Sequence, residues 1–124
     1  MIEIKLNTKA IPAPRPRVTK TGTYMPENYR RFKEALKWRF KPFKSFGKQL
    51  VKLELEFVFK QPSISAMNKR KYSAPVGDAD NLAKGIMDAM NGILFDDDTV
   101  VVELNVKKYY GEKDMILIKM NTVV

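Results

Sequence analysis

The sequence contains no histidine and no cysteine among its 124 residues. Without cysteine there is no disulfide and no thiolate metal site, which agrees with a cytoplasmic protein. Without histidine there is no Ser-His-Asp or Cys-His machinery, no imidazole base and no ordinary zinc site. Any catalysis must therefore use carboxylates, lysine, hydroxyl groups or a bound hard cation.

Long apolar runs are also missing. No segment approaches the roughly 18 apolar residues of a transmembrane helix, and the N-terminal MIEIKLNTKA lacks the apolar block of a signal peptide. The composition, 44% hydrophobic and 30% charged, is typical of a folded protein. We therefore expect a single domain spanning residues 1–124, with no membrane attachment.

Acidic residues are in the minority, with 14 Asp and Glu against 23 Lys and Arg, for a net charge of +9. This excess favours a polyanionic partner, nucleic acid above all, although a charge that serves only solubility is the alternative. Residues 1–77 carry a net +13, residues 78–98 carry −5 and the rest +1. Such an acidic island fits carboxylates that hold a divalent cation beside a surface that holds a polyanion.

The hydrophobic pattern predicts an α/β (α+β) domain, with two main helices and a small mixed sheet, in the order β-α-β-loop-α-β-β. Strands are expected at residues 2–8, 50–60, 99–108 and 114–122, and helices at 27–41 and 80–92. Between these elements, the proline-rich residues 10–26 predict loop or extended backbone, and residues 61–77 predict a long polar loop.

Two groups of aspartates flank the second predicted helix. Asp78 and Asp80 stand two apart in its extended lead-in, so both carboxylates can point to one place; a simple helix cap is the alternative, although one Asp suffices for that. Asp96, Asp97 and Asp98 follow the helix, where Asp-rich turns are ordinary. Three adjacent carboxylates nevertheless repel one another, and a bound Mg²⁺ or Mn²⁺, which prefers oxygen ligands, would relieve that repulsion.

The helix between these groups is about 20 Å long, so its ends meet only if the chain after Gly92 returns alongside it. Lys84 stands one turn after Asp80 on the same face. It either pairs with Asp80 and Asp88 or contacts a scissile phosphate and stabilises charge in the transition state.

The run DADNLAKGIMDAMNG at residues 78–92, followed by DDD, resembles the signature of the RusA family of Holliday junction resolvases. That signature reads approximately D-x-D-N-x-x-K-x-x-x-D-A-L-x-G, followed by a D-D pair before a strand. The segment PAPRPR at residues 12–17 also resembles the proline- and arginine-rich N-terminal loop of that family. The resemblance covers most of the chain.

The resemblance implies a Mg²⁺-dependent homodimeric endodeoxyribonuclease, with Mn²⁺ as a substitute ion. Such an enzyme resolves four-way DNA junctions by paired symmetric nicks in recombination and repair, and the family is common in prophages. Its metal-binding aspartates map onto Asp78, Asp80 and Asp98, or onto Asp97 if the alignment takes a one-residue gap. The family lysine maps onto Lys84.

Basic side chains of the two long loops are expected to contact the DNA backbone, so that binding weakens steeply with salt. These residues are Arg15, Arg17, Lys20, Lys69, Arg70 and Lys71. A C₂ dimer would present two sites to the two-fold junction. The alternatives are a non-catalytic DNA- or RNA-binding protein whose aspartates only cap and turn, and a nuclease that acts on flaps or other branched DNA.

Overall fold

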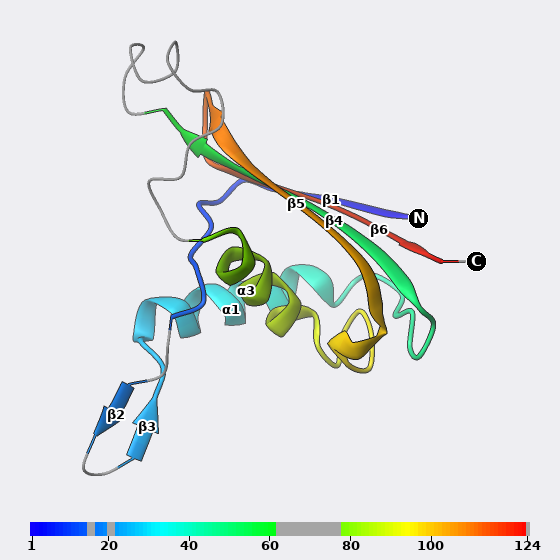
Figure 1. Cartoon of the computed structure of the whole chain (residues 1–124), viewed down its shortest axis with the longest axis horizontal. Helices are drawn as coiled ribbons and strands as arrows, with labels where there is room; N and C mark the ends of the chain where they lie inside the picture. Colours follow the sequence, from blue (N-terminus) through cyan, green and yellow to red (C-terminus); the bar gives the residue numbers. More distant parts are fainter. Residues whose placement is uncertain (15–16, 20–21, 62–77, 124) are drawn as a thin grey trace.

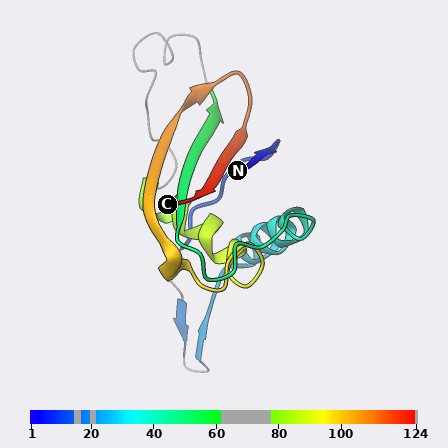
Figure 2. The same ribbon diagram turned by 90° about the vertical axis from the view of Figure 1, so that its right-hand side faces the viewer.

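The computed structural model describes residues 1–14, 17–19, 22–61 and 78–123. Its main sheet has four strands: β1 (Ile2–Leu6), β4 (Val51–Lys60), β5 (Val101–Gly111) and β6 (Met115–Thr122). Their spatial order is β1-β6-β4-β5, which Figure 2 shows edge to edge. Strand β4 pairs parallel with β5 and antiparallel with β6, which is in turn antiparallel to β1. The predicted small mixed sheet is confirmed.

Two helices, α1 (Glu27–Phe40) and α3 (Ala79–Met90), lie against one face of this sheet and leave the other face uncovered (Figure 1). Helix α1 buries the apolar stripe that its spacing predicts. The buried residues are Tyr29, Phe32, Leu36 and Phe40. Because α3 follows β4 and leads into the parallel strand β5, it forms the crossover that a parallel pair requires. The predicted α/β class with two main helices is thus confirmed.

The interior strand β4 supplies the centre of the core. Its side chains alternate between a fully buried face, which includes Leu53, Leu55 and Phe57, and a face that exposes Lys52. Each fully buried apolar side chain of this size contributes about 1.5–3 kcal/mol to folding. The regular alternation fixes which face of the sheet receives the helices, since a shift of one residue would turn this apolar set toward water.

Three local features differ from the predicted elements. The proline-rich segment contains a short antiparallel pair, β2 (Arg17–Thr19) and β3 (Gly22–Tyr24), which sequence reasoning left as loop or extended backbone. The strand expected from residue 99 begins instead with a 3₁₀ turn, η1 (Asp98–Val100). Helix α3 ends at Met90, and Gly92 follows with a φ of 78°, a left-handed conformation that favours glycine.

The long polar loop predicted at residues 61–77 falls, from residue 62 onward, outside the described residues. Among the helices in the described ranges, none is both long and apolar enough to cross a bilayer.

Candidate active site

The start of α3 presents two exposed carboxylates. Asp78 is the N-cap residue and is extended (φ −84°, ψ 151°), and its carbonyl accepts a 3.0 Å hydrogen bond from the Leu82 amide. Its side chain nevertheless forms no capping hydrogen bond, and Asp80 lies within the first turn. Negative charge is favourable here because the helix N-terminus is positive. The capping explanation for Asp78 is therefore wrong, and both carboxylates present oxygen atoms that suit a hard cation.

The second aspartate group lies beyond the other end of the helix. Asp97 caps η1, where its carboxylate accepts a 3.4 Å hydrogen bond from the Thr99 amide. Asp98 is the first residue of η1 and is half-buried, whereas Asp96 is exposed. The Asp96 amide donates a 3.0 Å hydrogen bond to the Gly47 carbonyl, which ties this turn to the segment between α1 and β4.

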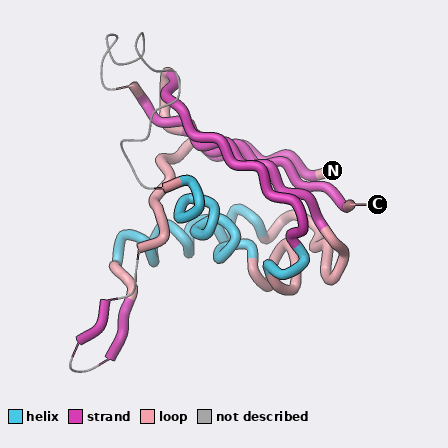
Figure 3. The backbone as a smooth tube through the Cα atoms, in the orientation of Figure 1, coloured by secondary structure: helices cyan, strands magenta, loops and turns pink. Residues whose placement is uncertain are grey.

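These two aspartate groups do not meet within one chain. Helix α3 has twelve residues, and so separates them by about 18 Å along its axis. The chain after Gly92 turns on itself, with the Gly92 amide 2.8 Å from the Phe95 carbonyl, and does not return alongside the helix (Figures 1 and 3). In the described part of the chain, no three acidic side chains are placed to share a metal ion. One chain thus places Asp78 and Asp80 at the same end of α3, and Asp97 and Asp98 beyond the other end.

Lys84 lies on the exposed side of α3, where 62% of its side chain is accessible. Its ammonium nitrogen is 3.9 Å from a carboxylate oxygen of Asp88, one turn further along. Within the described residues it forms no ion pair with Asp80, the other partner that its spacing allowed. The ion-pair partner of Lys84 thus lies toward the C-terminal end of α3, and the exposed ammonium can approach a ligand bound near Asp80.

Asp88 has a second partner that sequence reasoning missed. The hydroxyl group of the fully buried Tyr29 donates a 3.1 Å hydrogen bond to it. Burial raises the pKa of Tyr29 far above its usual range, and the charge of Asp88 and this hydrogen bond raise it further. The phenol thus remains a donor. A signal was available, because Tyr29 is the one member of the α1 apolar stripe with a polar tip.

The N-terminal segment docks beside the aspartate pair. The amide of the buried Ala13 donates a 3.0 Å hydrogen bond to the carbonyl of Asn81, in the first turn of α3. Gly85 allows this approach: a Cβ there would lie 3.3 Å from Cε1 of Tyr29 and 3.4 Å from the carbonyl oxygen of Ile11. The segment that leads toward the arginines is therefore anchored next to Asp80.

Of the residues predicted to contact DNA, the structure describes only the backbone of Arg17. Arg15, Lys20, Lys69, Arg70 and Lys71 lie outside the described residues, and Arg17 is described through its backbone in β2. Their role in binding stays a prediction.

Two comparisons relate the chain to known proteins. A protein-family model described as "Endodeoxyribonuclease RusA" matches residues 7–121, a range that includes every aspartate discussed above. A curated protein, "Uncharacterized protein YqaN" of Bacillus subtilis (strain 168), is 35% identical over 69 residues, which cover 49% of each protein. The chain thus spans about half the length of this relative.

Proposed function

The chain belongs to the RusA family of endodeoxyribonucleases, and from this membership we propose that it is a divalent-cation-dependent endonuclease that resolves four-way DNA junctions by paired nicks. One observation carries the proposal. Asp78 and Asp80 stand at the start of α3 with both carboxylates exposed, and the N-cap carboxylate is not used for capping. Exposed carboxylate oxygens at one helix end are ligands of the kind that hard divalent cations take.

The ligand of this pair is Mg²⁺, or Mn²⁺ in its place, and Asp98 or Asp97 completes the site. Exposed carboxylates suit Mg²⁺, which usually keeps several waters and takes one or two protein carboxylates beside substrate phosphate. When bound, the ion lowers the pKa of a water molecule and stabilises negative charge on the phosphate. The sequence has no histidine that could act as an imidazole base instead.

Lys84 orients the DNA next to this pair. It lies one turn from Asp80 on the same face of α3, and its exposed ammonium donates hydrogen bonds to the scissile phosphate. Asp88, which accepts a hydrogen bond from the buried Tyr29, attracts that ammonium along the exposed side of α3. The N-terminal segment docks at the same end of the helix through the Ala13 amide, which donates to the Asn81 carbonyl.

We further propose that the protein acts as a homodimer in which each site uses both chains. Asp78 and Asp80 lie at one end of α3, whereas Asp97 and Asp98 lie at the other. A two-fold axis that sets two α3 helices antiparallel brings the aspartate pair of one protomer next to the partner's Asp98 or the partner's Asp97. It also presents two equivalent sites to a two-fold junction, which is what paired nicks require.

A nicking assay tests the proposal. The purified protein is incubated with a synthetic four-way junction, a flap and a linear duplex, each with Mg²⁺ or with EDTA. We expect Mg²⁺-dependent paired nicks in the junction that Asp80→Asn abolishes while binding persists. Asp96→Asn, which removes the same charge from an exposed aspartate outside the proposed ligand set, is expected to cleave normally.

Other outcomes have definite meanings. Tight binding without cleavage in Mg²⁺, unaffected by Asp80→Asn, would leave a non-catalytic DNA-binding protein. Cleavage that prefers the flap would give a nuclease of branched DNA with another substrate.

A further inference from the structure

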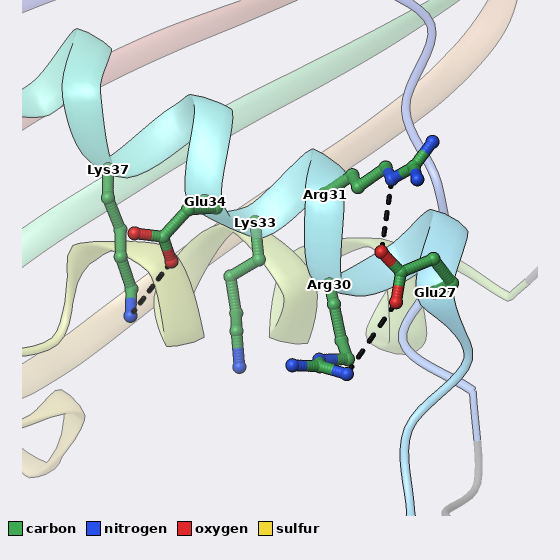
Figure 4. Close-up of a pocket in the computed structure, with 6 residues that line it drawn as sticks. All are labelled: Glu27, Arg30, Arg31, Lys33, Glu34 and Lys37. Carbon is green, nitrogen blue, oxygen red and sulfur yellow. Dashed lines mark hydrogen bonds and ion pairs between the residues drawn. The ribbon is translucent and has the colours of Figure 1, made fainter.

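A shallow groove of about 440 Å³ runs along the solvent side of α1. Figure 4 shows six described residues that line it, all of them charged: Glu27, Arg30, Arg31, Lys33, Glu34 and Lys37. Four cations face two carboxylates, so the described part of the lining is basic, and none of these six side chains is apolar. An anion with several charges in a row is the ligand that complements it.

Three of these cations form a line. Arg30, Lys33 and Lys37 follow the i, i+3, i+7 spacing of one helix face and extend side by side in Figure 4. We call them the α1 stripe. At 1.5 Å per residue the stripe is about 10 Å long. Successive phosphates on one DNA strand advance about 3.4 Å along the duplex axis. The stripe spans about three such steps, and its three cations can contact at most about three phosphates of one strand.

The existing partners of the α1 stripe are weak enough to give way. Arg30 is 3.6 Å from Glu27 and Lys37 is 3.9 Å from Glu34, and both carboxylate side chains are more than 60% exposed. Exposed pairs of this kind contribute about 0–1 kcal/mol. The Lys33 ammonium lies 5.6 Å from the ring centroid of Tyr29, at the outer limit of a cation–π contact. A phosphate can thus replace these partners at little cost.

The α1 stripe is connected to the candidate active site through Tyr29. Lys33 sits over the Tyr29 ring, the Tyr29 hydroxyl group contacts Asp88, and Asp88 pairs with Lys84. Since these contacts run from α1 to the exposed side of α3, the stripe borders the surface that carries Lys84. A nucleic acid that reaches Lys84 therefore passes close to α1.

We propose that the α1 stripe is a second DNA-binding surface, which holds the phosphate backbone of one arm of the branched substrate beside the cleavage site. This inference rests on the proposed function and adds to it a binding element distinct from the two long basic loops. It predicts contacts with the backbone alone, and hence no dependence on base sequence.

Charge removal with a matched control tests the inference. One variant carries Arg30→Ala, Lys33→Ala and Lys37→Ala. The control carries Lys5→Ala, Lys52→Ala and Lys119→Ala, which remove the same three charges from exposed positions on the uncovered face of the sheet. Both are made in an Asp80→Asn background, and binding of a labelled four-way junction is followed by fluorescence anisotropy.

Each lost phosphate contact lowers the slope of log K against log salt by about 0.9. The stripe variant is expected to lose about two to three in this slope and roughly tenfold or more in affinity near 0.1 M salt. The control should lose clearly less, since it changes only the net charge. Equal losses in the two variants would overturn the inference.

Trp38 provides an independent readout, because it is the only tryptophan in the sequence and lies on α1 next to Lys37. Its side chain is 66% exposed, with the Lys41 ammonium 3.7 Å from the ring centroid. DNA bound along α1 is expected to change its emission in parallel with the anisotropy.

Assays of the wild-type protein distinguish failure of this inference from failure of the proposed function. If it cleaves the junction while the stripe and control variants bind alike, this inference fails and the proposed function stands. If it neither binds nor cleaves branched DNA, both fail.

Discussion

The hydroxyl group of Tyr29 lies 3.1 Å from a carboxylate oxygen of Asp88, a residue 59 positions later in the chain. This hydrogen bond joins α1 to the polar side of α3, and the other carboxylate oxygen of Asp88 pairs with Lys84 at 3.9 Å. A fully buried donor thus fixes a carboxylate that in turn holds an exposed ammonium.

Tyr29→Phe is expected to lower the free energy of unfolding by about 1 kcal/mol, because it removes one hydrogen bond to a charged group that is still paired with Lys84. Urea unfolding followed by circular dichroism measures the change. Tyr110→Phe serves as the control, since the buried Tyr110 has no hydrogen bond from its hydroxyl group within the described residues. Equal effects of the two substitutions would remove the hydrogen bond as the cause.

The same tyrosine predicts how stability changes in alkali. Burial raises the pKa of Tyr29 above its unfolded value, so above about pH 10 the unfolded chain loses this proton while the folded chain retains it. The contribution of protonated Tyr29 to stability is fully present below about pH 10, and the free energy of unfolding falls as the pH rises beyond that value. Tyr29→Phe should show a shallower loss than wild type between about pH 10 and 11.5. Parallel curves would contradict the prediction.

Asp88→Asn tests whether Asp88 positions Lys84. The amide still accepts from Tyr29 but no longer attracts the ammonium, so we expect kcat for junction cleavage to fall about tenfold with KM little changed. Lys84→Met should lower kcat for junction cleavage about 100-fold. If Asp88 acts through Lys84, the double variant should be no slower than Lys84→Met alone. Additive losses would show that Asp88 has a separate role.

Gly85→Val probes the docking of the N-terminal segment. A Cβ at this position already lies 3.3 Å from the Tyr29 ring and 3.4 Å from the Ile11 carbonyl oxygen, and the methyl groups of valine extend further. We expect a loss of about 1–3 kcal/mol in the free energy of unfolding and weaker junction binding, as the segment is displaced from α3. Gly85→Ala should cost less, because alanine gains about 1 kcal/mol in helix propensity. A valine variant as stable as wild type would contradict the close packing.

Elements with a strong hydrophobic period could be predicted from sequence. The alternation along β4 and the apolar stripe of α1 are local patterns, and they gave both elements and their buried faces. The run of residues 78–92 likewise located the aspartate pair, because its spacing is short and regular. The β2–β3 pair was missed because its proline-rich surroundings carry no alternation.

Contacts that depend on tertiary packing could not be predicted from local sequence patterns. The contact of Tyr29 with Asp88 follows from the crossing of α1 over α3, which no spacing within either helix specifies. The distance between the two aspartate groups depended on the path after Gly92. Residues 93–98 are long enough to return along the helix, but hydrogen bonds to Phe95 and Gly47 turn them away.

Because the two aspartate groups lie at opposite ends of α3, mixing two inactive variants tests whether each site is shared between the chains of the proposed dimer. Asp80→Asn and Asp98→Asn homodimers should each be inactive, and the two proteins are mixed under conditions that allow subunit exchange. If each site combines Asp80 of one chain with the partner's Asp98, a mixed dimer has one doubly mutated site and one intact site, so nicking returns. Sites confined to one chain would leave every site damaged and the mixture inactive.

If the third ligand is Asp97 instead, Asp98→Asn alone retains activity and Asp97→Asn takes its place in the mixture. Because one intact site cuts one strand, we expect the restored activity to give single nicks in the junction, where wild type gives paired ones, and a denaturing gel with both strands labelled distinguishes these products.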